Sequence, residues 1–352
     1  MTTFAALYVP AALRAAVSDD AWLAAMLDAE RALARVTGAE AGDDVFRPEL
    51  YDLAALCEEG QADASPVVPL ARALRERAPD AHRYATSQDI LDTAAMLVAR
   101  NARTLVLAEL DGAAEACAGL AETHRSTVMA GRTLLQRARP VTFGSTAAGW
   151  LFGLVAARRR LAGVIVPAQL GGPVGTLEPG LAARFAAELE LDTAVVPWHV
   201  HRAPMAELAG ALDAVGAACG KVGLDVVLLA LNEVGEVSES EGGGSSSMPH
   251  KRNPAAAVLA RACARLVHVN ASLLVGAEHE LQRAAGAWQA EWPALSAALA
   301  FAGGASAGVR RSLEGLEVHA DRMAANAAGL DGDIGAAEAV VDRALAYYRA
   351  RE

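Results

Sequence analysis

The sequence predicts an all-α protein, a bundle of long helices, and three observations lead to this prediction. Alanine, the residue with the highest helix propensity, dominates most of the 352-residue chain, and aromatic residues make up only 5 % of it. Apolar residues recur at helical spacing over long proline-free stretches. No stretch stands out for the period-two alternation of a half-buried strand, so a βαβ architecture is not expected.

The chain divides into three predicted regions. Residues 1–86 are expected to form an N-terminal domain of short helices, because breakers recur there, namely Gly38, Gly42, Pro48, Gly60, Pro66, Pro69 and Pro79. Residues 87–325 are expected to form the central bundle, and residues 326–352 a short C-terminal helical tail.

Four long helices are predicted within the central region. The first begins at Ser87, a plausible N-cap, with Asp89 in its first turn. The others are expected over residues 147–166, 206–237 and 254–276. Their apolar residues extend beyond one stripe, as in the run Val226–Leu229, so these helices should be buried on several sides. We therefore expect a bundle that other subunits complete, and a monomeric helical protein is the alternative.

Composition and charge exclude several classes. The net charge of −11 and pI near 5.3 argue against a nucleic-acid-binding face. Mean hydropathy is +0.24, yet no run is long and apolar enough to span a bilayer, and the N-terminus lacks a secretory signal, so a cytoplasmic location is expected. Four scattered cysteines form no metal-binding or disulfide pattern, and we expect them to be small core residues.

Residues 239–253, ESEGGGSSSMPHKRN, differ from the rest of the chain. Three glycines and three serines interrupt two predicted helices, and the segment ends with Lys251, Arg252 and Asn253 before Pro254. Glycines let backbone amides approach a ligand, and hydroxyls and an ammonium group suit a developing negative charge. A flexible linker is the alternative, but a linker would not lead directly into a buried helix.

Three segments together resemble the fumarase/aspartase superfamily. GSSSMPHKRNP, residues 244–254, matches the GSSxMPxKxNP signature at every fixed position. ATSQDILDTA, residues 85–94, is similar to the first conserved region of that superfamily. GRTLLQRARPVTFG, residues 131–144, is similar to the second, GRTxxQxAxPxTxG. The resemblance spans residues 65–340, essentially the whole chain.

The resemblance implies addition or elimination next to a carboxylate, through an aci-carboxylate and without a cofactor or metal. Ser245 corresponds to the proton-exchanging serine, and Lys251 and Asn253 to residues that bind the reacting carboxylate. Further substrate contacts are implied for Thr86, Ser87, Gln88, Thr133, Gln136, Ser246 and Met248. The alternative for the hydroxyl groups, above all Thr86 and Ser87, is a capping or turn role.

Two departures indicate the branch of the superfamily. The histidine and glutamate of the lyase charge relay are replaced here by Leu134 and Val258. Carboxymuconate cycloisomerases resemble the chain on this point, and also in VPWHVHRAPMAEL and GAWQAEW. The implied reaction is lactonisation of 3-carboxy-cis,cis-muconate to γ-carboxymuconolactone, a step of aromatic catabolism. Tyr84 stands where those enzymes have glycine, and relatives often continue beyond this C-terminus.

A tricarboxylate substrate requires more than one cation. Arg202 with His199 is the leading additional pair, and Arg132 is a weaker candidate. The resemblance also implies a homotetramer whose sites combine residues of several chains, since the three conserved regions are expected on different parts of long helices. Two alternatives stay open, namely another lyase of the superfamily, such as an adenylosuccinate-lyase-like enzyme, and a catalytically silent structural member.

Overall fold

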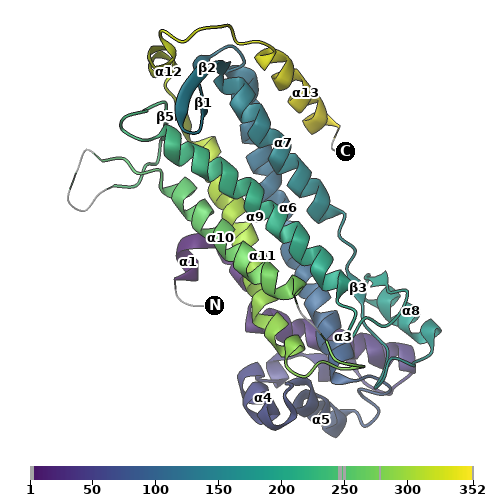
Figure 1. The fold of residues 1–352 in the computed structure, drawn as a ribbon. Helices are drawn as coiled ribbons and strands as arrows, with labels where there is room; N and C mark the ends of the chain where they lie inside the picture. Colours follow the sequence, from purple (N-terminus) through teal and green to yellow (C-terminus); the bar gives the residue numbers. More distant parts are fainter. Residues whose placement is uncertain (1–3, 245–247, 249–250, 277–278, 351–352) are drawn as a thin grey trace.

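Five long helices form the body of the molecule in this computed structural model, which describes residues 4–244, 248, 251–276 and 279–350. They run side by side along one axis, as Figure 1 shows. Their bounds are α6 (Ser87–Thr123), α7 (Phe143–Ala162), α9 (Ala203–Leu229), α10 (Ala255–Val275) and α11 (Ala287–Glu314). The predicted all-α long-helix bundle is confirmed.

Shorter helices lie at the two ends of the bundle. Near the beginning of α6 are α3 (Asp19–Thr37), α4 (Leu53–Glu59), α5 (Val67–Arg77) and α8 (Pro179–Glu188), while α1 (Ala5–Tyr8) and α2 (Ala11–Ala16) lie against the bundle itself (Figure 1). Toward the opposite end are α12 (Ala320–Ala327) and α13 (Ala337–Arg349), which packs on α7. Short 3₁₀ turns cover Asp43–Phe46, Pro48–Leu50 and Gly60–Asp63. The division into domains at residues 86 and 325 stays a prediction.

The structure also contains three small sheets that periodicity did not predict. Antiparallel β1 (Val128–Thr133) and β2 (Gln136–Thr142) form a hairpin, and antiparallel β5 (Val237–Glu239) pairs with β6 (Leu316–Val318). Two-residue strands β3 (Pro167–Ala168) and β4 (Asp192–Thr193) pair in parallel. The placement of the second conserved region on a long helix was therefore wrong, because this region forms the β1–β2 hairpin.

The hairpin turn explains why a helical pattern failed here. Thr133 pairs with Gln136, so Leu134 and Leu135 alone make the turn, with φ angles of 49° and 63°. Two consecutive residues with positive φ are the geometry of the two-residue turns that match the twist of a hairpin. Leucine is an unusual choice for such a turn, which hid it from sequence reasoning.

The observed helix boundaries differ from the predicted ones by several residues. Thr86, not Ser87, is the N-cap of α6, and its backbone N–H donates to the Asp89 carboxylate at 2.9 Å. Helix α7 spans Phe143–Ala162 and not residues 147–166. Helix α9 ends at Leu229, well before residue 237, because the chain turns there into strand β5.

The cysteines are not all core residues. Cys117, Cys219 and Cys263 are buried, and burial raises the pKa of Cys219 and of Cys263 to about 12. Cys57 is exposed, so the expectation of a core position was wrong for this residue. Its helix α4 lies at the periphery of the molecule and packs with only part of one face.

Two bundle helices, α10 and α11, are long and apolar enough for a membrane span, with mean hydropathies of 1.4 and 1.2 over their most apolar windows. Two thirds of the α11 window is buried inside the bundle, which makes α11 the core helix of this fold. Only one third of the α10 window is buried. Helix α10 therefore presents an apolar face that the single chain leaves open, formed by Val258, Leu266, Val269 and Leu273.

Candidate active site

The two ends of the signature segment are held together by its own backbone. Gly243 and Asn253 exchange backbone hydrogen bonds of 2.8 and 2.9 Å, and the Asn253 side-chain amide donates to the Gly244 carbonyl at 3.3 Å. The buried Glu239 carboxylate accepts from the first free N–H groups of α10, those of Ala256 and Ala257. This capping fixes the segment to the N-terminus of α10. Ser245 and Ser246 lie outside the described residues.

Lys251, Asn253 and Met248 line one groove of about 1000 Å³. Its apolar walls come from the end of α9 and the beginning of α10, including Val227, Leu231 and Val258. Lys251 is exposed and Asn253 is half-buried. The groove therefore places an ammonium group and an amide beside an apolar surface, which suits a carboxylate on a hydrocarbon skeleton.

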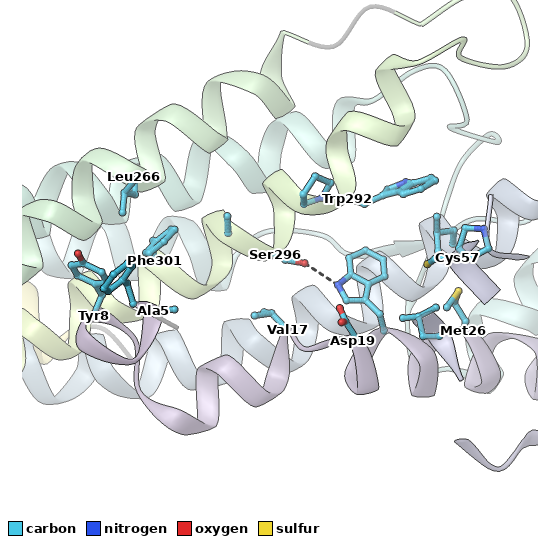
Figure 2. A pocket seen from close by; sticks show the side chains of 17 residues that line it. Ala5, Tyr8, Val17, Asp19, Met26, Cys57, Leu266, Trp292, Ser296 and Phe301 are labelled. Atoms are coloured by element: carbon cyan, nitrogen blue, oxygen red, sulfur yellow. Dashed lines mark hydrogen bonds between the residues drawn. The ribbon is translucent and has the colours of Figure 1, made fainter. Parts of the chain in front are cut away.

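A second, more apolar cavity of about 660 Å³ contains none of the predicted site residues. It lies between the N-terminal helices and α11, and Figure 2 shows Tyr8, Met26, Trp292 and Phe301 around it. Ser296 accepts a 2.8 Å hydrogen bond there from the indole of Trp22. We therefore assign the candidate site to the groove of the signature segment.

The first conserved region is a turn at the start of α6, and only part of it is accessible. Thr86 and Ser87 are half-buried, but Gln88 is buried. The Gln88 amide donates to Asp92 at 3.1 Å and to the His199 carbonyl at 2.7 Å. Both donors therefore point into the protein and hold the turn, and the substrate contact of Gln88 stays a prediction.

His199 is also used inside the protein. Its Nε2 lies 2.6 Å from Asp89 Oδ1, and both side chains are buried. The same carboxylate accepts from the backbone N–H groups of Gly171, Gly172 and Thr86 at 2.9–3.0 Å. Asp89 thus fixes the Thr86 turn, and the Nε2 atom of His199 is occupied by Asp89.

Arg202 lies between two buried carboxylates. It makes bonds of 2.7 and 2.9 Å to Asp92 and a bidentate pair with Glu291, and Trp288 adds an indole hydrogen bond to Asp92 at 2.9 Å. Burial alone would lower the pKa of Arg202, but Asp92 and Glu291 raise it above its usual range. Both members of the predicted pair therefore face internal carboxylates, Arg202 those of Asp92 and Glu291 and His199 that of Asp89.

Arg132 is similarly occupied at the hairpin. It forms a bidentate ion pair of 2.8 and 2.9 Å with Glu236, which is fully buried and also accepts from Asn326. This pair anchors β1 to the segment that precedes β5. Thr133 and Gln136 remain exposed at the end of the hairpin, where a substrate or another chain can reach them.

One chain does not bring the three conserved regions together. Helix α6 has 37 residues, which corresponds to a length of about 55 Å, and it separates the Thr86 turn from the hairpin. Figure 1 shows the start of α6 near α3 and α5, whereas the hairpin and the signature segment lie toward the opposite end. Within a single chain, the Thr86 turn is therefore far from the hairpin and from the groove beside β5.

Several residues of this network were not singled out from the sequence. Asp92, Trp288 and Glu291 occur in the segments DILDTA and GAWQAEW, which carried the resemblance, but nothing in either segment alone indicates that they meet. Arg283 was missed as well, and it donates to the Gly172 carbonyl at 2.6 Å beside the Thr86 turn. Burial lowers the pKa of Arg283, while Asp89 and Asp92 act in the opposite direction.

Comparison with known proteins defines the class. A family profile described as Lyase matches residues 67–268, more than half of the chain, and the chain belongs to this lyase family. Nitrosuccinate lyase of Streptomyces davaonensis is 45 % identical, with 89 % of this chain and 74 % of that protein covered. The 3-carboxy-cis,cis-muconate cycloisomerase of Bradyrhizobium diazoefficiens is 40 % identical, with 90 % and 77 % covered. The crystal structure of the Pseudomonas putida 3-carboxy-cis,cis-muconate lactonizing enzyme superimposes with a TM-score of 0.85 at 33 % identity, covering 99 % of this chain and 86 % of that one.

Leu134, at the position of the relay histidine, gives a first prediction. Its side chain is 96 % exposed at the hairpin tip of the single chain, so a polar replacement there would not be buried among apolar residues. Leu134→His should leave the melting temperature unchanged and should not raise turnover, because Val258 supplies no carboxylate partner. Steady-state kinetics and thermal melting check this. Improved turnover would mean that the relay had merely been lost from an otherwise relay-dependent enzyme.

Proposed function

We propose that the protein is a cycloisomerase that lactonises 3-carboxy-cis,cis-muconate to γ-carboxymuconolactone. The observation that carries this proposal is the groove in which Lys251 and Asn253 lie beside Val258, without the glutamate of the lyase relay. Relatives named for this reaction are 40 % identical, and the histidine position of the relay is Leu134. The reaction needs no relay, because the nucleophile is a carboxylate of the substrate, which is already ionised.

In the proposed reaction, the groove positions the substrate and three residues act on it. The groove holds the diene curled, so that one carboxylate closes a five-membered lactone on the far alkene carbon. The π electrons move toward the carbon next to a second carboxylate, which becomes an aci-carboxylate stabilised by Lys251 and Asn253. Ser245 then delivers the proton to that carbon. No cofactor takes part in this scheme.

Elimination from nitrosuccinate is a second candidate, and two observations favour it. The 45 % identical relative is a nitrosuccinate lyase. In addition, the three extra cations predicted for a tricarboxylate, Arg132, His199 and Arg202, are paired with internal carboxylates. A dicarboxylate with a nitro group would require fewer cations than a tricarboxylate.

A direct assay distinguishes the two reactions. Lactonisation removes the conjugated diene of 3-carboxymuconate and can be followed by loss of its ultraviolet absorbance. Elimination from nitrosuccinate releases nitrite, which a colorimetric assay detects. The proposal expects absorbance loss and no nitrite, with γ-carboxymuconolactone identified by NMR. Nitrite release without diene loss would overturn it in favour of the second candidate.

We also propose that the active enzyme is a homotetramer whose sites combine several chains. Two features support this proposal. The Thr86 turn lies at the start of α6, at the far end of the long helices from β5 and the groove (Figure 1), and the exposed face of α10 carries four apolar residues. Packing that face against another copy removes it from water, and antiparallel packing brings opposite ends of the bundle together.

Complementation between inactive variants tests the shared site. Ser245→Ala and Thr86→Ala should each lose most turnover while they retain the fold. After unfolding and co-refolding at equal amounts, about one quarter of the sites should contain both intact residues if these come from different chains. Recovered activity near that fraction is expected, and a Ser245→Ala, Thr86→Ala double variant mixed with wild type serves as the control. A fully active monomer in sedimentation experiments would contradict the assembly.

A further inference from the structure

A histidine that the proposed reaction does not use lies in the same groove as Lys251 and Asn253. His319, directly before α12, lines the groove together with Ser238 of β5. Among the described residues, the charged side chains that line it are Glu233, Glu239, Lys251 and Arg252, and His319 contributes an imidazole. Glu239 is committed to capping α10. His319 was not singled out from the sequence, and it belongs to none of the three conserved regions.

The hydrogen bonds of His319 fix which of its nitrogens carries a proton. Ser238 Oγ lies 2.8 Å from Glu317 Oε2 and 3.0 Å from His319 Nε2. An ionised carboxylate can only accept, so the Ser238 hydroxyl donates its proton to Glu317. Its oxygen is then the acceptor for His319, and Nε2 must be protonated. The ring orientation is set by a chain of bonds that ends on a negative charge.

Strand pairing holds this chain of bonds in place. Ser238 and Glu317 are direct partners in the β5–β6 register, and the His319 backbone N–H donates to the Glu236 carbonyl at 3.0 Å. Glu236 is itself held by the bidentate pair with Arg132. The imidazole is therefore attached to the same rigid connection that follows α9 and forms one wall of the groove.

We propose that His319, as an imidazolium supported by Ser238 and Glu317, is a further carboxylate-binding residue of the groove. This inference rests on the proposed function and supplies the cation that Arg132, His199 and Arg202 do not. With Nε2 donating to Ser238, protonation adds a second N–H, on Nδ1, and this is the donor that we assign to an anionic ligand in the groove. The substrate class is a di- or tricarboxylate with one carboxylate bound at Lys251 and another at His319.

The proposal predicts a pH dependence of binding with a definite sign. Only a ring protonated on both nitrogens donates from Nδ1, so the affinity for a carboxylate should be higher at acidic than at basic pH. Removal of the imidazole should abolish this difference.

Binding of propane-1,2,3-tricarboxylate to the full-length assembled enzyme tests this by calorimetry at pH values of about 6 and 8. At the acidic pH, the dissociation constant of wild type should be about three- to tenfold lower than that of His319→Gln. At the basic pH, the two dissociation constants should be similar. Comparing variants at each pH cancels the protonation of the ligand itself. His268→Gln is the matched control, because His268 is an exposed histidine paired with Asp213, outside the groove.

The possible outcomes are separable. Ser238→Ala should weaken acidic binding in the same direction as His319→Gln, because the ring loses its support. Equal affinities of wild type and His319→Gln at both pH values would overturn the inference even if diene turnover is normal. Normal carboxylate binding with the predicted pH effect but no diene turnover would instead contradict the proposed reaction and leave His319 as a carboxylate ligand.

Discussion

Replacing Lys251 by methionine is expected to lower kcat/KM by about two to three orders of magnitude, the usual effect of removing one group that stabilises a developing oxyanion. Lys251 is exposed in the groove, and its side chain has no ion-pair partner among the described residues. The melting temperature should therefore stay unchanged. Initial rates of diene loss measured over a range of substrate concentrations give the result.

The chain supplies a matched control for this substitution. Its only other lysine is Lys221, which is exposed on α9 and paired with Asp225 at 2.5 Å. Lys221→Met removes the same charge from the protein and should leave kcat/KM unchanged. If Lys251→Met kept wild-type kinetics, or if both variants lost activity equally, the assignment of Lys251 to the carboxylate would have to be abandoned.

Replacing Arg202 by methionine is expected to lower the free energy of unfolding by about 3–5 kcal/mol, since it removes the guanidinium group from two buried carboxylates, of which only Glu291 has another basic neighbour, the His279 imidazole at 3.1 Å. Asp92 and Glu291 are almost fully buried, and both accept hydrogen bonds from the guanidinium group. Denaturant titration followed by circular dichroism measures the change. Activity should fall too, because Asp92 also accepts from Gln88 at the Thr86 turn.

Arg35→Met is the control for that measurement. Arg35 also faces two carboxylates, those of Asp43 and Glu188, but all three side chains are exposed or half-exposed. Solvent screens such pairs, so the stability should hardly change. Similar losses for the two variants would show that burial of the Arg202 network is not what makes it important.

The sequence predicted four of the five long helices because helical periodicity persists through them, but the core helix α11 was not predicted. The first turn of α6 and the beginning of α10 were placed within one residue, since Thr86, Ser87 and Pro254 mark them chemically. The hairpin at residues 128–142 was missed because its strands carry arginines and its turn consists of two leucines. The turn contains no glycine, asparagine or aspartate that would indicate a hairpin, so the hairpin is seen only in the structure.

The site was predicted less completely, for a physical reason. A sequence shows that Arg202 is a cation but not that Asp92 and Glu291, more than eighty residues away on either side, neutralise it. Contacts of this kind depend on which helix faces pack together. The same limit hid His319, whose partners Ser238 and Glu317 come from two short strands that periodicity does not indicate.

The most direct test of the proposed function is a comparison of specificity constants on the same preparation of enzyme. Purified protein is given 3-carboxy-cis,cis-muconate and nitrosuccinate in separate initial-rate series, and kcat/KM is determined for each. We expect a value for the carboxymuconate that exceeds the other by at least about a hundredfold, because elimination needs a group that removes a proton and the relay positions are occupied by Leu134 and Val258. A higher kcat/KM for nitrosuccinate, or no loss of diene at all, would contradict it.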